Sequence, residues 1–511
     1  MSTSYAANAL ASALRAPSLG REAEIFAEAD GRPDLSFGDL WSGAERMAAA
    51  LAAAGVRPGD RVAVQAEKSL EAVQLYLGAL LCGGCFLPLN TAYTPEEIAF
   101  FLDDAAPTVF VCDPARAEAL SQAAEAAHAQ VLTLDAAGAG TLAEARDAAP
   151  AFAGAAARAT DDLACILYTS GTTGRSKGAM LTHGNLLSNA LTLRDYWRFT
   201  AEDRLIHALP IFHAHGLYVA LNVTLVAGGA LIFHAKFDAD AVAAALPRAT
   251  ALMGVPTFYT RLLAHPGLTR DAVANMRLFI SGSAPLLEET HRQWSERTGH
   301  AILERYGMTE TSMNASNPYD GERRPGSVGF PLPGVELRVT DPESGEILGA
   351  GEIGGLEVRG PNVFKGYWRM PEKTEEEFRD GGWFITGDMA VIGEDGYVSI
   401  VGRAKDLVIS GGYNVYPKEI EGLIDDLPGV LESAVIGVPH ADFGEAVVAV
   451  VTPQAGEAPS EVAVREALSD RIAKYKQPKR VIFVEELPRN TMGKVQKNLL
   501  RDAHKDLFGA G

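Results

Sequence analysis

Apolar and polar positions alternate with two different periods in the first part of the chain. The short runs 61–65 and 108–112 are apolar and contain β-branched residues, which is typical of buried strands. Between them, residues 69–81 follow the period of an amphipathic helix. Because strands that alternate with helices build layered α/β domains with parallel sheets, we expect such a domain over the first 110 residues, resuming from 161 to about 320.

Two other stretches depart from this alternation. Residues 113–160 are rich in alanine and weakly patterned, which favours surface helices and a loose connection without chemistry. After residue 325, glycines, prolines and short β-branched runs such as 335–339 and 355–359 predict a small antiparallel β unit.

The last hundred residues have a compact α+β pattern. Strand-like runs occur at 433–438 and 446–451, and a helix-like run covers 461–473. We therefore predict an α/β fold with a large, multi-layered N-terminal domain, residues 1–402, made of two α/β subdomains and the small β unit. A smaller, mobile α+β domain follows at 403–511.

The charge and the apolar content limit the classes of function. The 511 residues carry a formal net charge of −20, which argues against nucleic acid or an anionic membrane as a partner. The N-terminus lacks the pattern of a secretory signal, and no apolar run reaches the roughly 18 residues that a membrane span needs. The four cysteines favour a reducing compartment, so we expect a cytoplasmic protein.

Cys82 and Cys85 form a C-x-x-C pattern in an apolar setting. No second cysteine pair or histidine stands nearby. Buried packing is the favoured interpretation, and redox or metal chemistry is the alternative.

The segment 168–178 carries the most informative polar pattern in the chain. It follows the apolar run 163–167, which predicts a buried strand. Its glycines allow close backbone approach to a bulky anion, its hydroxyl groups add donors, and Lys177 adds a positive charge. Such a loop suits a polyphosphate, most simply the triphosphate of ATP.

Three other interpretations of this loop are open from its residues. A Walker A loop fails because Ser176 stands at the position of the second glycine and Gly178 follows the lysine. The pattern Gly-x-Ser-x-Gly around Ser176 matches the nucleophile elbow of hydrolases, but several residues separate that serine from the strand. A plain surface turn is the third alternative.

Further polar motifs stand downstream in apolar surroundings, at 212–216, 304–311, 386–388, 410–414 and 488–495. The spacing of His213 and His215 could serve a metal, a packed core or a wall that faces an anion. In the segment 304–311 a tyrosine could stack on a purine and a carboxylate could hold magnesium, although such charged runs often only solvate a loop.

Taken together, these motifs resemble those of the adenylate-forming superfamily, which includes acyl-CoA synthetases, nonribosomal-peptide adenylation domains and beetle luciferases. The resemblance covers nearly the whole chain, and the motifs follow the order of the family. Two positions depart from it. Ser176 replaces a proline that is common before the loop lysine, and Lys405 stands at the hinge, where many relatives carry aspartate.

The resemblance implies a ligase that works in two steps. A carboxylate attacks the α-phosphate of ATP to give an acyl-adenylate and pyrophosphate, and a thiol then displaces AMP. ATP, Mg²⁺ and coenzyme A are the implied ligands. The small C-terminal domain is expected to rotate between the steps about Lys405 and Asp406, which replaces Lys494 by the turn at Gly411 and Gly412 in the pantetheine channel.

The implied nucleotide contacts come from all the motifs. The β- and γ-phosphates are expected at Thr169, Ser170, Gly171, Thr172, Thr173, Gly174 and Lys177. Adenine is expected at Gly282, Ser283, Ala284 and Tyr306, with Glu304, Arg305 and Gly307 also in the nucleotide site. Asp388 and Arg403 would hold the ribose. The implied catalytic residues are Thr309 at the α-phosphate, Glu310 at the magnesium, Lys494 between carboxylate and phosphate, and His213.

The acid is expected to be a small dicarboxylate. Segments 209–216, 254–263, 316–323 and 494–497 resemble malonyl-CoA synthetases, which implies malonate, and methylmalonate less well. The acid pocket is expected at His213, Arg261, Ser283 and Met308. A buried arginine needs an anion, and a second carboxylate would supply one to Arg261; the alternative is an exposed helix arginine.

Two alternatives from other classes stay open. The chain could load a carrier protein in place of coenzyme A, which a comparison of the two thiols would decide. A binding module without catalysis fits poorly, since Glu310 and Lys494 are both present. Lys494 is also a candidate for regulatory acylation.

Overall fold

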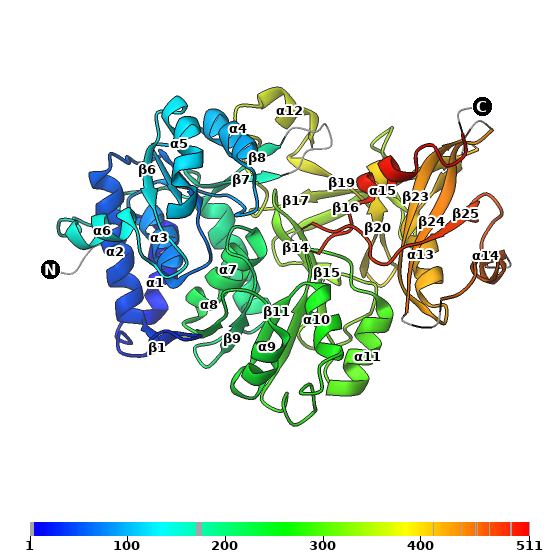
Figure 1. Cartoon of the computed structure of the whole chain (residues 1–511), viewed down its shortest axis with the longest axis horizontal. Helices are drawn as coiled ribbons and strands as arrows, with labels where there is room; N and C mark the ends of the chain where they lie inside the picture. The colour runs from blue at the N-terminus through cyan, green and yellow to red at the C-terminus, as the bar shows by residue number, and fades with distance from the viewer. Residues whose placement is uncertain are drawn as a thin grey trace.

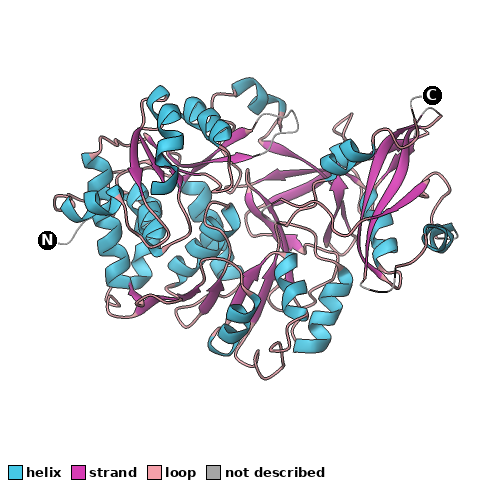
Figure 2. Ribbon diagram, in the orientation of Figure 1, coloured by secondary structure: helices cyan, strands magenta, loops and turns pink. Residues whose placement is uncertain are grey.

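The computed structural model describes residues 5–169, 176–411, 413–440, 442–454, 456, 458–469, 471–490 and 493–509. Within these residues the strands form four sheets, two large and two small. Figure 1 shows that the two small sheets lie towards the C-terminal end of the molecule, and Figure 2 shows the helices that accompany each sheet. The predicted α/β fold is confirmed.

The first large sheet has the strand order β6-β5-β3-β4-β7-β8. Its strands are β3 (Arg61–Gln65), β4 (Cys85–Pro88), β5 (Val109–Cys112), β6 (Gln130–Thr133), β7 (Leu163–Thr169) and β8 (Lys177–Thr182). All pairs are parallel except β7 with β8, which form an antiparallel hairpin. The neighbouring helices are α1 (Ala9–Arg15), α2 (Phe37–Ala53), α3 (Leu70–Leu81), α4 (Pro95–Ala105), α5 (Ala117–Ala126) and α6 (Thr141–Ala148).

The predicted elements of this sheet are confirmed within two residues, since the strand predicted at 163–167 extends to Thr169. The side chain of Ser69 accepts a hydrogen bond from the backbone of Ala72 and caps α3, so the helix itself begins at Leu70. The strand at 130–133 was not predicted, because only Leu132 among its four residues is buried. A strand with so little apolar signal is difficult to recognise from one sequence.

The second large sheet has the order β15-β14-β13-β12-β11-β9-β10-β1-β2. Its strands are β1 (Ile25–Ala29), β2 (Leu35–Ser36), β9 (Arg204–His207), β10 (Ala230–Phe233), β11 (Ala251–Gly254), β12 (Leu278–Ser281), β13 (Leu303–Met308), β14 (Ser312–Ser316) and β15 (Phe330–Pro331). The helices of this region are α7 (His183–Tyr196), α8 (Asn222–Ala227), α9 (Ala239–Ala245), α10 (Pro256–Leu263) and α11 (Glu288–Thr298). From β1 to β13 the central strands are parallel, so their carboxyl ends share one edge.

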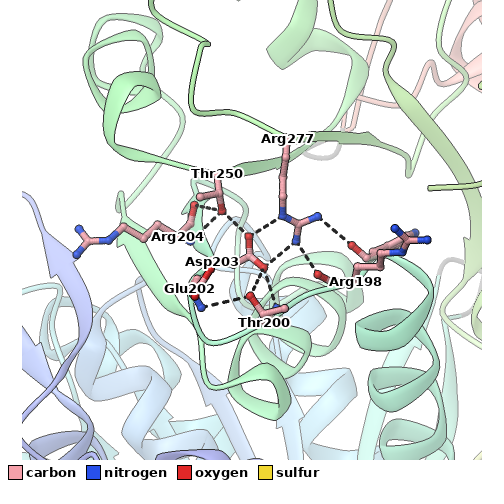
Figure 3. A network of polar contacts seen from close by, with 8 residues as sticks. Arg198, Thr200, Glu202, Asp203, Arg204, Thr250 and Arg277 are labelled. Carbon is pink, nitrogen blue, oxygen red and sulfur yellow. Dashed lines mark hydrogen bonds and ion pairs between the residues drawn. The ribbon is translucent and has the colours of Figure 1, made fainter. Parts of the chain in front are cut away.

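An ion pair between the buried Asp203 and the half-buried Arg277 joins the amino ends of three of these strands (Figure 3). Arg277 Nε and Nη2 each donate to one carboxylate oxygen of Asp203 at 2.7 Å. The Thr250 hydroxyl and the backbone N–H of Thr200 also donate to this carboxylate. Arg277 donates further to carbonyl oxygens of the turn before β9. Burial alone would raise the pKa of Asp203, but these donors outweigh it and the pKa lies below its usual value.

The predicted antiparallel β unit is also confirmed. Its strands are β16 (Glu336–Thr340), β17 (Gly354–Arg359), β18 (Phe378–Arg379), β19 (Trp383–Ile392) and β20 (Val398–Arg403), and all their pairs are antiparallel. The short helix α12 (Pro371–Glu376) precedes β18.

The C-terminal region contains the fourth sheet. Its strands are β21 (Val408–Ser410), β22 (Tyr413–Val415), β23 (Val430–His440), β24 (Gly444–Pro453) and β25 (Arg480–Phe483), and its helices are α13 (Pro417–Asp425), α14 (Glu461–Ser469) and α15 (Lys497–His504). The predicted strands are confirmed and extend further than expected. The predicted helix 461–473 ends earlier, at Ser469. The chain passes from the antiparallel β unit to the C-terminal sheet between Arg403 and Val408.

The cysteines pack in the core. All four are free and buried, and burial raises the pKa of Cys82 to about 11 and of Cys85 to about 12. Their thiols therefore stay protonated at neutral pH, which agrees with the packing interpretation. In the described part of the chain, no helix is both long and apolar enough to cross a membrane.

Candidate active site

The hairpin β7–β8 presents two of the expected phosphate ligands side by side. Thr169 is the last residue of β7 and pairs with Lys177, the first residue of β8. The expected ligands Ser170, Gly171, Thr172, Thr173 and Gly174 lie outside the described residues.

Lys177 is buried and held by two side chains that sequence reasoning missed. Its Nζ lies 2.8 Å from Glu377 Oε1 and 4.1 Å from the centre of the Tyr367 ring. Tyr367 donates in turn to Glu377 at 3.0 Å. Glu377 ends a run of three glutamates that reads as an exposed helix end, so the sequence offered no signal for this contact.

Glu310 is a buried carboxylate beside this hairpin. It accepts a hydrogen bond from Tyr367 at 3.1 Å, and Thr169 Oγ1 lies 3.5 Å away. Burial raises the pKa of Glu310, against the opposing effects of Tyr367 and the charge of Lys177. Because Glu310 forms no ion pair with a described residue, a cation fits here, and a carboxylate oxygen is a ligand that Mg²⁺ accepts.

The residues expected at the ribose are joined by short contacts. Asp388 Oδ1 lies 2.6 Å from Arg403 Nε, and Tyr306 donates to Asp388 Oδ2 at 2.5 Å. The two charged residues are paired across β19 and β20, whereas Tyr306 comes from β13. The contact between Tyr306 and Asp388 therefore links the second large sheet to the antiparallel β unit. Thr309 follows β13 on a partly exposed turn.

Lys494 reaches this site from the C-terminal region. A Cβ added at Gly493 would lie 3.4 Å from the side chain of Thr257 on α10, so the loop that carries Lys494 lies against the N-terminal part. Burial and the charge of Arg403 lower the pKa of Lys494 to about 8, and Asp388 opposes them. The expected catalytic lysine thus faces the expected ribose ligands.

The expected acid site gathers residues from the carboxyl ends of several strands. His215 Nδ1 lies 3.1 Å from Ser283 Oγ, and the backbone N–H of His215 donates to His213 Nδ1 at 3.2 Å. Burial lowers the pKa of His213 to about 4 and that of His215 also, so both rings are neutral at pH 7. Ser283 has a φ of 71°, a left-handed conformation that is strained for serine.

Arg261 does not lie where the sequence argument placed it. We expected it in the first turns of a helix and buried. The helix α10 has only eight residues, Arg261 stands in its last turn, and the side chain is exposed. Because the helix is so short, five residues past Pro256 is already its outer end. Arg261 makes no hydrogen bond or ion pair with another described residue.

The remaining expected nucleotide residues differ in their surroundings. Gly282 and Ala284 flank Ser283 after β12. Gly307 cannot carry a side chain, since an added Cβ would lie 1.9 Å from the Ser312 carbonyl oxygen. Glu304 is buried and accepts from the backbone of Leu286 at 3.3 Å, and burial raises its pKa to about 7.

Met308, the turn at Gly411 and the hinge are the last of the expected residues to be located. Met308 is half-buried against the main core. Gly411 lies in the turn between β21 and β22, donates to the Phe443 carbonyl at 2.8 Å and is exposed; Gly412 lies outside the described residues. At the expected hinge, Asp406 pairs with Arg501 of α15 at 2.9 Å.

The histidines show no metal-binding arrangement. Within the described residues, no group of three or more His, Cys, Asp or Glu side chains could hold a metal ion by itself. The His215 ring instead contacts Ser283, and His213 accepts a hydrogen bond from the backbone of His215.

Two parts of the chain match models of known protein families. Residues 11–368 match the model of the AMP-binding enzymes, and residues 419–494 match the model of the AMP-binding enzyme C-terminal domain. The chain belongs to the AMP-binding enzyme family.

Solved structures that are similar to this AMP-binding enzyme agree with the family assignment. The ATP-bound crystal structure of MatB from Rhodopseudomonas palustris is 59% identical, covers 98% of this chain and 99% of its own, and superposes with a TM-score of 0.96. The apo crystal structure of that protein gives 0.86 over 98% and 99% of the two chains. This chain therefore superposes better on the ATP-bound structure than on the apo structure.

Curated relatives act on different acids. A feruloyl-CoA synthase from Amycolatopsis sp is 38% identical over 91% of this chain and 93% of its own length. A malonate–CoA ligase from Arabidopsis thaliana is 34% identical over 88% and 78% of the two chains. Membership of the family thus fixes the reaction class, and the acid must be argued from the site.

Proposed function

We propose that this enzyme joins malonate, and methylmalonate less well, to coenzyme A through an acyl-adenylate, with release of AMP and pyrophosphate. The observation that carries the reaction is the position of Lys494, which faces the pair Asp388–Arg403 across the junction of the two parts. The likeness to MatB over nearly the whole chain and the malonate–CoA ligases among the relatives support the acid.

The first step must bring one anion to another, so the site has to neutralise charge on the phosphates. In this proposal Lys177 and Thr169 hold the β- and γ-phosphates from the hairpin. Arg403 and Asp388 hold the ribose, and Lys494 lies between the attacking carboxylate and the α-phosphate. The Tyr306–Asp388 contact fixes the orientation of the ribose ligands before the nucleotide arrives.

Glu310 is the residue that would hold Mg²⁺. When bound, the ion would withdraw charge from the phosphate oxygens. Tyr367 orients the carboxylate of Glu310 and also contacts Glu377, the partner of Lys177. One tyrosine therefore positions both the acidic and the basic ligand of the triphosphate.

The second step requires a different arrangement of the two parts. We propose the domain boundary at 402/403, supported by the change of sheet between Arg403 and Val408, and a rotation about Lys405 and Asp406. The rotation would remove Lys494 and bring the turn at Gly411 and Gly412 to the coenzyme A thiol. Acylation of Lys494 would remove its positive charge and block the first step, which is how we propose that such a modification would regulate the enzyme.

The acid site is proposed at His213, Arg261, Ser283 and Met308. The neutral histidine and the serine hydroxyl offer hydrogen bonds, the half-buried methionine limits the length of the acid, and the exposed arginine offers a positive charge. These groups suit a short, polar acid better than an aromatic one, because an aryl group needs an apolar lining.

The deciding experiment is a panel of C2 to C6 mono- and dicarboxylates with ATP and coenzyme A, read as AMP formation. We expect malonate to give the highest kcat/KM and methylmalonate the next. A preference for a monocarboxylate of this panel, or for ferulate or benzoate added to it, would overturn the acid assignment and leave the reaction class intact. A carrier-protein thiol in place of coenzyme A should give no product.

Kinetics of Arg261→Ala test the role of the exposed arginine. We expect kcat/KM for malonate to fall more than that for acetate, since only malonate has a second carboxylate. An equal fall for both acids would show that Arg261 does not contact that carboxylate.

A further inference from the structure

Lys68 is a buried lysine without an anionic partner. The residue is 8% exposed, and it forms no ion pair with another described residue. It stands one residue before Ser69, which caps α3, so the helix dipole also disfavours a cation at this position. Lysines are rarely buried, and burial lowers the pKa of Lys68 well below its usual value. The presence of this side chain here therefore needs an explanation.

Three acceptors surround the Lys68 Nζ atom at the carboxyl edge of the second large sheet. Two are carbonyl oxygens, of His207 at 2.8 Å and of His234 at 2.6 Å. His207 is the last residue of β9, and His234 directly follows β10. The third acceptor is the His207 ring, whose Nδ1 lies 2.9 Å away. Since Lys68 comes from the segment between β3 and α3, these contacts join the first large sheet to the second.

The partners of the His207 ring determine where its hydrogens lie. Its other nitrogen, Nε2, lies 2.8 Å from the Gly216 carbonyl oxygen, which can only accept, so Nε2 carries a hydrogen. The four contacts of these two side chains need one hydrogen each, whereas a neutral lysine and a neutral histidine supply only three. The pair therefore holds one positive charge. Burial and the charge of Lys68 lower the pKa of His207, so the charge belongs to Lys68, and His207 Nδ1 accepts from it.

Gly216 connects this pair to the proposed acid site. It is the second residue of a π-helix, His215–Leu221, and π-helical turns are rare and frequent at functional sites. The His215 ring contacts Ser283 through Nδ1 at 3.1 Å, and its Nε2 is buried without a partner among the described residues. The turn is tightly packed, because a Cβ added at Gly216 would lie 2.1 Å from the Pro210 carbonyl oxygen. A shift of Gly216 would therefore carry the adjacent His215 with it.

We propose that Lys68 is a positioning residue for the acid site and acts through His207 and the Gly216 carbonyl. Lys68 donates to Nδ1 of His207 and so holds the ring in the tautomer that donates from Nε2. That hydrogen bond fixes the first turn of the π-helix and keeps the His215 ring beside Ser283. The inference rests on the proposed acid site, and it adds to that site a residue of the first sheet region, 139 positions before His207.

Lys68→Met tests the proposal, because methionine keeps the apolar stem and removes the donors. We expect KM for malonate to rise on the order of 10- to 100-fold, since a small misplacement of a contacting group can cost that much. KM for ATP should stay within about twofold, because the phosphate ligands share no partner with Lys68. A variant that is merely unstable would contain less active enzyme, which lowers kcat and leaves both KM values unchanged. An unchanged KM for malonate, or equal rises in both KM values, would overturn the proposal.

Two variants of His207 separate its hydrogen bonds from its volume. His207→Gln keeps an N–H for Gly216 and an oxygen that can accept from Lys68, so KM for malonate should stay within about threefold of the wild type. His207→Leu has neither group and should reproduce the rise expected for Lys68→Met. If Lys68→Met does not fold, equal malonate KM values for His207→Gln and His207→Leu would overturn the proposal.

The double variant Lys68→Met/His207→Leu tests whether the two residues act in one chain of contacts. Its KM for malonate should be no higher than that of either single variant, because the first substitution already breaks the chain. Additive rises would show that Lys68 does not act through His207 and would overturn the proposal.

Gln65→Met is the matched control. Gln65 is also buried and belongs to the same segment, but its amide donates to the carbonyl oxygens of Asn90 and Tyr93. We expect this variant to lose thermal stability while KM for malonate stays within about twofold of the wild type. A rise as large as that in Lys68→Met would assign the effect to the packing of this segment and would overturn the proposal.

Nitrogen NMR of enzyme with isotope-labelled histidine tests the proton positions without substrate. The His207 signals, identified by their loss in His207→Gln, should be those of a neutral ring with its hydrogen on Nε2, and the Nδ1 signal should shift in Lys68→Met. An imidazolium or an Nδ1–H signal in the wild type would overturn the proposal. If the wild type turns over no dicarboxylate, the proposed function fails; the NMR signals, and the KM comparison made with the acid that the enzyme does use, then still decide the role of Lys68.

Discussion

The charge of Lys494 should set the alkaline limit of the first half-reaction. Burial and the positive charges of Arg403 and Lys405 lower the pKa of Lys494 to about 8, although Asp388 and Asp406 oppose them. A group with that pKa is about 90% protonated at pH 7 and about 10% protonated at pH 9. If only the ammonium form supports attack on the α-phosphate, the rate constant should fall about tenfold across this interval.

The assay must isolate adenylation from thiol transfer. Pyrophosphate release at saturating malonate, without coenzyme A, avoids the thiol of coenzyme A, whose ionisation would raise the rate over the same range. The quantity to plot is kcat/KM for ATP, because it reports the pKa of the enzyme before ATP binds. Bound triphosphate would raise the pKa of Lys494 and would hide the effect in kcat.

Two substitutions change this profile in opposite ways. Lys494→Arg keeps its charge at every pH of the assay, so its lower rate should be independent of pH between 7 and 9. Lys405→Met removes a positive neighbour and should move the alkaline limb to higher pH. Lys476→Met is the control, since Lys476 pairs with Glu419 on the surface of the C-terminal part, and its profile should match the wild type. A wild-type rate that stays constant to pH 9, or an unchanged decline in Lys494→Arg, would refute the reasoning.

Three other substitutions test residues that support the candidate site or lie beside it. Asp203→Asn should lower the free energy of unfolding by about 2 kcal/mol at pH 7, because it leaves the half-buried Arg277 without its anion; in urea unfolding this loss should shrink as the pH falls from about 4 through the lower folded-state pKa of Asp203, since the carboxylate of the wild type is then protonated as well. Glu377→Gln should lower KM for ATP about two- to fivefold in the pyrophosphate assay, because it removes the anion that competes for Lys177. Gly307→Ala should reduce adenylation more than about tenfold at unchanged secondary structure, measured by circular dichroism, since its Cβ would collide with a backbone carbonyl; near-wild-type turnover would contradict the tight fit at this position.

The local elements were predictable because their signals are local. The strand at 61–65 and the helix that begins after Ser69 follow from the spacing of apolar residues and from the serine that caps the helix. The position of β1 in the second sheet was not predictable, because its partner β10 stands some 200 residues later in the sequence. Pairing over such a separation depends on the assembled core, which no window of sequence contains.

The same distinction between local and long-range features holds for the residues of the candidate site. Motif residues such as Glu310, Asp388 and Lys494 could be proposed from the sequence by resemblance to a family. The exposure of Arg261 could not, because it depends on where a helix of eight residues ends. The burial of Arg305 depends on Gly282, which is distant in the sequence and has no side chain to mark it.

The ion pair between Asp203 and Arg277 lies at the amino ends of the strands whose carboxyl ends lead to the proposed acid site. Each of these strands therefore has one end that holds the sheet together and another that leads to the residues proposed to select the acid. An engineer who seeks new acids should randomise the residues that follow the strands and leave those that precede them untouched. Stability gained at the amino ends would then offset the cost of new side chains at the other edge, because the two sets of residues lie at opposite ends of the strands and their effects should add.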